Sequence, residues 1–249
     1  MTAVSPAREE PLPAALPMLL SFVAGYVDSY TYLALFGLFA AQVTGSFVIA
    51  GAEFVSHDSG VVGKLLAIVA FLVAAAVTAA LIGLIRERGG AGLPSMLGLE
   101  ALLLAVFVAI ILLGPRIAGA SDWHGIVAGL FAAMAMGTQS VLVRLLMKGI
   151  PQTNVMTGNM TQVGIATTEI ILAWRRCARA PHNRDAAEEF RSVRRNLLVV
   201  LSVAVGFLAG AAAGAGAFAA TNVHGALLAV AIVIALALWM LYRERSVSP

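Results

Sequence analysis

The amino-acid sequence predicts an all-α, polytopic helical membrane protein made of two related halves. Hydrophobic residues occupy 60% of the 249 positions and charged residues only 12%, whereas about a quarter of the residues in soluble domains are charged. The apolar runs are long and continuous, unlike the alternating strands of roughly ten residues that build membrane barrels. A short polar motif also occurs once in each half. Together these observations predict several membrane-spanning helices with an internal repeat.

Hydropathy indicates six strong apolar segments, each close to the roughly 20 residues that one crossing needs. They cover residues 14–36, 64–85, 95–113, 125–147, 197–220 and 224–242. Two weaker and more polar segments lie between them, at 41–56 and 153–174. We expect these two to be short motif helices that do not cross the bilayer completely.

The basic residues predict the orientation of the chain. With six crossings and a cytoplasmic amino terminus, 14 basic residues lie inside and two, Lys64 and Arg116, lie outside. With eight crossings, 12 basic residues lie inside and 4 lie outside. The positive-inside rule therefore favours six crossings. Both alternatives place the two termini and an Arg-rich loop at 175–195 in the cytoplasm, as expected for a bacterial inner (plasma) membrane protein.

The domain organisation follows from these segments. We expect a cytoplasmic tail at 1–13, a first membrane repeat at 14–116, a second repeat at 117–242 that contains the 175–195 loop, and a tail at 243–249.

The repeat consists of two polar motifs at matching places. Residues 25–28 (Gly-Tyr-Val-Asp) are followed, after a turn near Gly37, by Val-Thr-Gly-Ser at 43–46. Gly-Thr-Gln-Ser at 137–140 is followed, after a turn at Gly149, by Met-Thr-Gly-Asn-Met-Thr-Gln at 156–162. Repeats are sought first because they decide the whole architecture.

Small residues four positions apart predict close helix packing in both halves. The two sets that match each other are Ala75, Ala79 and Gly83 in the first half and Gly206, Gly210 and Gly214 in the second. Such stripes allow two helix backbones to approach closely in lipid.

Three complete crossings in each half would invert the second half relative to the first. Inverted repeats with short, polar segments at corresponding positions indicate a transporter-like site between the halves. Four crossings in each half would instead make the repeats parallel and would weaken this indication.

Asp28 is the most informative candidate residue. It lies about 18 Å into the first segment, near the middle of a bilayer, where a carboxylate needs a partner or a proton. The hydroxyls of Tyr26, Tyr30 and Tyr32 are candidate partners, although tyrosines also gather at membrane interfaces. Glu100 and Glu169 lie nearer to segment ends and are expected at the interface.

The candidate substrate-binding site combines Asp28 with the two motif copies. Its residues are Asp28, Thr44, Gly45, Ser46, Gln139, Thr157, Gly158, Asn159 and Gln162. Helix starts inside the membrane would present free N–H groups to a polar ligand. The alternative is that the Thr and Asn side chains only cap these helices.

Several function classes lack their signatures. The single cysteine, Cys177, excludes an internal disulfide and a CxxC pair, and the four histidines are scattered without metal-ligand spacing. Phosphate-binding loops, HExxH and GxSxG motifs are also missing from the sequence. We therefore expect no enzyme activity, no cofactor, no metal and no nucleic-acid partner.

The paired motifs resemble those of the YoaK-like family of bacterial membrane proteins. The likeness rests on residues 25–28, 44–45, 137–139 and 155–161 and extends over about 16–242. The resemblance implies a multispan membrane protein of unknown function and implies no substrate. Ser46 departs from the family's first copy, which commonly has Asn there.

The sequence therefore predicts a small secondary transporter or permease for an unknown small solute, with the bilayer as its environment and a homodimer as a candidate assembly. The alternative is a non-transporting scaffold or partner-binding protein. An enzyme acting on lipid-soluble substrates is the weakest alternative.

Overall fold

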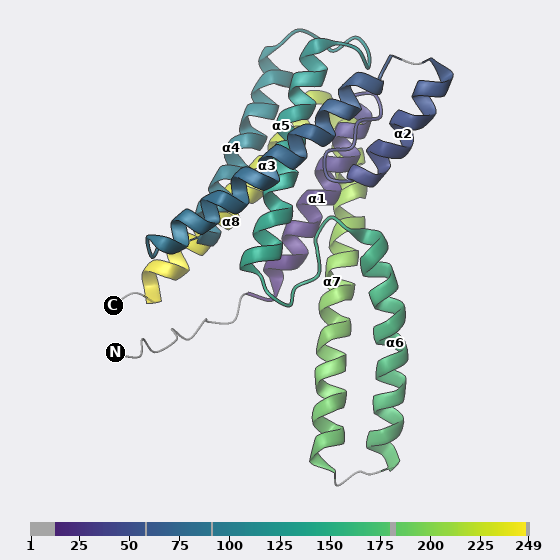
Figure 1. Cartoon of the computed structure of the whole chain (residues 1–249), viewed down its shortest axis with the longest axis vertical. Helices are drawn as coiled ribbons and strands as arrows, with labels where there is room; N and C mark the ends of the chain where they lie inside the picture. Colours follow the sequence, from purple (N-terminus) through teal and green to yellow (C-terminus); the bar gives the residue numbers. More distant parts are fainter. Residues whose placement is uncertain (1–12, 58, 91, 180–182, 248–249) are drawn as a thin grey trace.

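A computed structural model describes residues 13–57, 59–90, 92–179 and 183–247. The described part of the chain is helical and contains no strand (Figure 1). Its helices are α1 (Ala15–Ala34), α2 (Val43–Ser56), α3 (Val61–Glu87), α4 (Gly92–Leu113), α5 (Trp123–Leu146), α6 (Met156–Arg179), α7 (Arg184–Thr221) and α8 (Leu227–Val247), with a 3-10 turn, η1 (Asn222–Ala226), before α8. The all-α prediction is confirmed.

Four helical stretches in the described chain are long and apolar enough to cross a membrane. They are Val61–Glu87, Gly92–Leu113, Trp123–Leu146 and Arg184–Ser246, the last of which comprises α7, η1 and α8. Helix α1 is not among them, because a carboxylate and several hydroxyl groups dilute its apolar residues. The six predicted crossings therefore remain a prediction.

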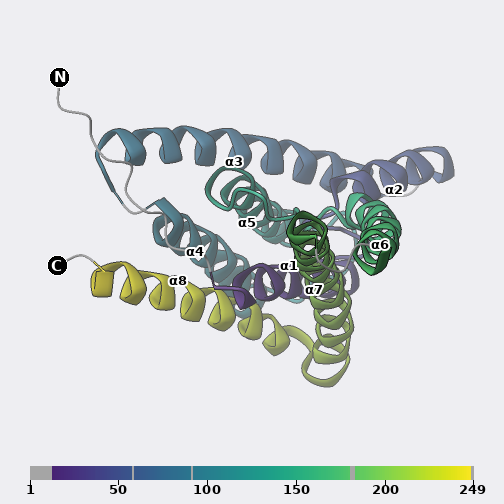
Figure 2. The same ribbon diagram turned by 90° about the horizontal axis from the view of Figure 1, so that it is seen from below.

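The buried core is built mainly by α1, α4, α5 and α8. Helices α1 and α5 occupy the middle of the bundle, with α3 on one side and α8 on the other (Figure 2). These two helices run antiparallel. Leu16 and Leu20, near the start of α1, share a buried cluster with Leu142 near the end of α5, whereas Tyr30, near the end of α1, shares a cluster with Ala128 near the start of α5.

Each of these central helices packs closely on a helix of the other half. A Cβ atom added to Gly210 of α7 would collide with the backbone of Phe22 in α1, and one added to Gly25 of α1 would collide with the backbone of Phe207. In the same way, a Cβ atom on Gly137 of α5 would lie 2.6 Å from the carbonyl oxygen of Phe71 in α3. Only glycine permits these approaches.

The predicted small-residue stripe is correct for α7 and wrong for α3. Gly206, Gly210 and Gly214 are all buried against the backbone of α1. In α3, however, a Cβ atom on Gly83 would meet nothing within 4 Å. The buried positions there are Ala74, Thr78 and Ile82, each one residue before a predicted contact. The face of α3 that is buried is therefore rotated by about 100° around the helix axis from the predicted face.

The two weak segments form helices that begin beside the last third of the helix preceding them, rather than beside its end. The predicted turns are confirmed, since Gly37 and Gly149 both have left-handed backbones, with φ of 85° and 78°. After these turns the chain returns along α1 or α5 before α2 or α6 begins. Neither helix start is therefore at the end of the bundle.

The expected loop at 175–195 is largely helical. Helix α6 continues to Arg179 and α7 starts at Arg184, so the two form a long hairpin that extends beyond the rest of the bundle (Figure 1). Arg176 and Glu189 form an ion pair of 2.7 Å across this hairpin.

Helix α8 runs to Val247 and so extends into the expected tail at 243–249. Residues 1–12 of the expected amino-terminal tail lie outside the described residues.

Candidate functional site

Asp28 lies in the last third of α1 and is 2% exposed. Its Oδ1 atom accepts hydrogen bonds from the backbone N–H groups of Ala41, at 2.6 Å, and Gln42, at 3.4 Å. These residues precede α2, so the carboxyl group holds the start of α2 against the middle of the bundle. Its other oxygen, Oδ2, is buried without a hydrogen-bond partner.

The tyrosines predicted as partners of Asp28 bind elsewhere. The Tyr26 hydroxyl donates to the carbonyl of Gly225 at 2.6 Å, and the Tyr30 hydroxyl donates to that of Asn222 at 2.7 Å. Both acceptors lie in η1, so these side chains fix η1 to α1. The Tyr32 ring instead packs against Phe39 in a tilted arrangement, with ring centroids 4.9 Å apart. The prediction was wrong for Tyr26 and Tyr30 because both rings point from α1 toward η1.

A second polar cluster surrounds Gln139, in the last third of α5. Its Nε2 atom donates to the carbonyl of Leu20 in α1, at 2.7 Å, and to the Thr153 hydroxyl, at 2.9 Å. The Ser21 hydroxyl lies 2.9 Å from the Thr153 carbonyl and 2.7 Å from that of Val203 in α7. This cluster therefore joins α1, α5, α7 and the segment before α6.

Ser140 occupies the position in the second half that matches Asp28. Its hydroxyl accepts a hydrogen bond of 2.7 Å from Nδ2 of Asn154. Asn154 precedes α6 just as Ala41 precedes α2. The same place in each half is thus used to hold a helix start, with a carboxylate in one case and a hydroxyl in the other.

The third residue of each Thr-Gly-(Ser/Asn) motif makes a matching contact. Ser46 Oγ donates to the carbonyl of Phe39 at 3.2 Å, and Asn159 Nδ2 donates to the carbonyl of Gln152 at 2.7 Å. Each acceptor is seven residues before its donor. The capping alternative requires the side chain to accept from a helix N–H, whereas Ser46 and Asn159 donate to the preceding turn.

The other motif residues are more accessible. Thr44, Thr157 and Gly158 are exposed, and Gly45 and Gln162 are partly buried. Helices α2 and α6 do not pack on each other in the described structure. The predicted site residues therefore form two polar clusters, one at Asp28 and Ser46 and the other at Gln139 and Asn159. Along α1 the two clusters are separated by the eight positions from Leu20 to Asp28, about 12 Å.

In the described part of the chain, the buried side-chain atoms that lack a hydrogen-bond partner are all oxygens. Among the described residues they are Asp28 Oδ2, Gln139 Oε1, Asn154 Oδ1 and both carboxylate oxygens of Glu100. A buried acceptor without a donor costs free energy, roughly 1–3 kcal/mol for an uncharged group. The interior around α1, α4 and α5 is therefore short of hydrogen-bond donors, or of positive charge.

Glu100, Ser21, Thr153 and Asn154 were not among the predicted site residues. Glu100 was expected at an interface, yet it is 0% exposed because α4 begins at Gly92 and places it near the helix middle. Asn154 could have been found, since it stands immediately before the second motif. The sequence gives no signal for Ser21, because its partners are more than 100 positions away.

The fold and these clusters define a helical protein with several membrane-compatible helices and two polar clusters within a largely apolar interior. The family model described as "Protein of unknown function (DUF1275)" matches residues 16–240. The chain belongs to this family, which is the YoaK-like family that its motifs resemble. Comparison with curated proteins and with solved structures gives no match.

Proposed function

We propose that this chain is a bacterial inner-membrane protein that works as a small secondary transporter, with a solute or coupling ion that supplies hydrogen-bond donors or positive charge. The observation that carries the proposal is the set of buried, unpartnered oxygens at Asp28, Glu100, Gln139 and Asn154. A proton, a metal cation or an ammonium group would satisfy such oxygens, whereas an anion would not. Intramembrane acids commonly mark ion or proton pathways.

We propose further that the two halves form an inverted repeat, and three features of the packing support this. Helices α1 and α5 run antiparallel, and their glycines Gly25 and Gly137 pack on the third helix of the opposite half. The two hydrogen bonds from Ser46 and Asn159 match in position and span. Transporters with inverted repeats place their sites where broken helices meet the bilayer middle.

The six-crossing topology is part of the proposal. In it α1, α3, α4, α5, α7 and α8 cross the bilayer, α2 and α6 cross only part of it, and both termini are cytoplasmic. The basic residues Arg86 and Arg144 lie at the same end of the bundle, where the Arg86 side chain donates to the carbonyl of Leu145 at 2.7 Å. This agrees with a common cytoplasmic side. We propose neither a catalytic role nor a cofactor.

The first test measures cation-dependent stability of the purified chain. Thermal unfolding is followed with Na⁺, K⁺ or methylammonium at constant ionic strength, with choline as the reference cation, and over a pH series for protons. Saturation at a hundred times the dissociation constant stabilises a protein by about 2.7 kcal/mol, or roughly 5–10 °C at this size. Asp28→Asn should lose the shift, and Glu169→Gln, an exposed acid, should keep it.

A cation that shifts the wild type is then tested for uptake in proteoliposomes. Loss of uptake in folded Asp28→Asn supports transport. The proposal fails if no probe shifts the wild type, or if Asp28→Asn responds as the wild type does.

The α6–α7 hairpin favours a second candidate, a membrane scaffold that binds a partner. Its distal part is exposed and carries seven arginines between residues 175 and 195. Neutralising Arg191, Arg194 and Arg195 together should abolish recovery of a stable, identified partner if the scaffold function is correct. Unchanged cation responses in the same variant would separate this role from transport.

A further inference from the structure

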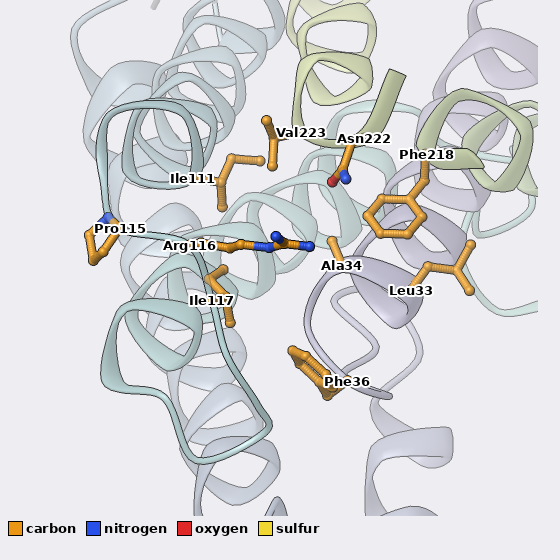
Figure 3. A pocket seen from close by; sticks show the side chains of 10 residues that line it. All are labelled: Leu33, Ala34, Phe36, Ile111, Pro115, Arg116, Ile117, Phe218, Asn222 and Val223. Carbon is orange, nitrogen blue, oxygen red and sulfur yellow. The ribbon is translucent and has the colours of Figure 1, made fainter. Parts of the chain in front are cut away.

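A cavity of about 180 Å³ lies at the end of the bundle where α1, α4 and α7 terminate. It is separate from the two polar clusters. Its lining residues are Leu33, Ala34, Phe36, Ile111, Pro115, Arg116, Ile117, Phe218, Asn222 and Val223 (Figure 3). Most of these side chains are apolar, so the two polar ones determine what the cavity can bind.

Arg116 supplies the charge. Figure 3 shows its side chain extending into the cavity, between Ile117 and Ala34 and toward Asn222. No ion pair to Arg116 is found among the described residues. A guanidinium group beside apolar walls, with its donors available, matches the oxygens of a phosphate or carboxylate.

Asn222 supplies a neutral polar group from the opposite wall. Its backbone has φ of 51°, and Phe36, on another part of the lining, has φ of 53°. Among the described residues, only His57 is a further non-glycine residue with positive φ. Two of these three residues with positive φ, Phe36 and Asn222, therefore line the same cavity. Such conformations are costly and are concentrated at binding sites.

The surrounding structure holds Asn222 in this conformation. The Tyr30 hydroxyl donates to its carbonyl oxygen at 2.7 Å, and the Tyr30 ring stands edge-on to Phe218, with centroids 5.6 Å apart. Tyr30 is 1% exposed. Tyr30 thus attaches Asn222 to the core, and the backbone of Asn222 is held in position before a ligand binds.

We propose that this cavity binds an oxyanion, a phosphate or carboxylate group, through Arg116 and Asn222. Leu33 and Phe36, which are 43% and 46% exposed, line the cavity. Apolar groups next to a guanidinium suit an anion joined to an apolar body. The phosphodiester of an anionic phospholipid has this chemistry, and a free phosphate shares its charged part.

The experiment compares two probes on the purified full chain. Dioleoylphosphatidylglycerol is added against dioleoylphosphatidylcholine, and inorganic phosphate is added against chloride at equal ionic strength. Binding is measured by native mass spectrometry and by thermal unfolding. The variants are Arg116→Gln, Arg116→Lys and Ile117→Phe, with Arg88→Gln as the matched control, because Arg88 is also exposed but lies on another loop.

We expect phosphatidylglycerol to bind at least tenfold more tightly than phosphatidylcholine to the wild type and to Arg88→Gln. Arg116→Gln should lose this selectivity, Arg116→Lys should retain part of it, and Ile117→Phe should weaken binding by filling the cavity with no change of charge. A response to inorganic phosphate that needs Arg116, without lipid selectivity, would identify a free oxyanion as the ligand and would also support the site.

The proposal is overturned if Arg116→Gln responds to both probes as the wild type does, or if neither probe binds selectively. Circular dichroism and the Arg116→Lys variant separate loss of binding from loss of folding. Cation responses at Asp28 are measured in the same samples, so failure here is distinguishable from failure of the transporter proposal.

Discussion

The Nζ atom of Lys64 lies 2.7 Å from Oε1 of Glu53 and 2.9 Å from its Oε2. Lys64, at the start of α3, is 2% exposed, and Glu53 is 17% exposed. The same ammonium group is 3.5 Å from the carbonyl of Phe36. One nearly buried ion pair therefore joins α2, α3 and the turn after α1.

Removal of Glu53 alone should be more harmful than removal of both charges. Glu53→Gln leaves a buried ammonium group without its counter-charge, which costs about 3–5 kcal/mol. The double variant Glu53→Gln/Lys64→Met should recover much of this loss, because it buries no unpaired charge. Chemical unfolding in detergent measures both, and a double variant less stable than Glu53→Gln would contradict the prediction.

Asp28→Ala and Asp28→Asn should differ in stability. The asparagine retains Oδ1 as an acceptor for the N–H groups of Ala41 and Gln42, whereas alanine leaves them unsatisfied. Alanine should cost roughly 1–3 kcal/mol more than asparagine. Proteolysis near residue 42 should accelerate in Asp28→Ala only. Equal proteolysis of the two variants would show that the carboxyl group does not anchor α2.

The motif residue Ser46 should tolerate asparagine. Ser46→Ala removes the bond to the Phe39 carbonyl and should cost about 1 kcal/mol, as should Asn159→Ala at the matching place. Ser46→Asn reproduces the side chain that makes this contact in the second half. Unfolding midpoints of the three variants provide the comparison, and a Ser46→Asn variant less stable than Ser46→Ala would refute the prediction.

Two glycines on α7 should respond oppositely to alanine. Gly210→Ala forces a methyl group into the backbone of Phe22 and should destabilise by roughly 1–3 kcal/mol. A Cβ atom on Gly216 meets nothing within 4 Å, so Gly216→Ala should be neutral or should stabilise by up to about 1 kcal/mol through helix propensity. The same unfolding measurement serves for both.

Asp122 should make the amino end of α5 sensitive to acid. Hydrogen bonds from the backbone N–H groups of Ala118 and His124 lower the pKa of its carboxyl group. The stabilisation is therefore present above the unfolded pKa of about 3.9 and is lost as the pH falls through the lower folded pKa. The difference in unfolding temperature between wild type and Asp122→Ala should shrink from pH 6 toward pH 3. A difference that grows in acid would contradict the assignment.

The sequence was sufficient for the apolar helices, the turns and the places of the two motifs, because hydropathy and glycine positions are local signals, but it missed the polar helical turns of α6 and α7 at 175–195. It was insufficient for contacts between distant segments. The periodicity of α3 was correct, but its buried face was predicted one residue too late, since spacing does not say which face meets a neighbour. Glu100 was misplaced because the predicted start of its segment lay three residues after the start of α4. The bond from Gln139 to Leu20 spans 119 positions and has no pattern in the sequence.

Helix α7 contains 38 residues, which gives it a length of about 57 Å, nearly twice the roughly 30 Å hydrocarbon core of a bilayer. If the contact of α7 with α1 at Gly210 is taken as a pivot, Arg184 at the hairpin tip lies about 39 Å from it along the helix. A tilt of about 10° at the pivot would displace the tip by roughly 7 Å at that lever length. The length of the α6–α7 hairpin would thus enlarge a small tilt of α7 within the bundle into a displacement of several ångströms at the hairpin tip.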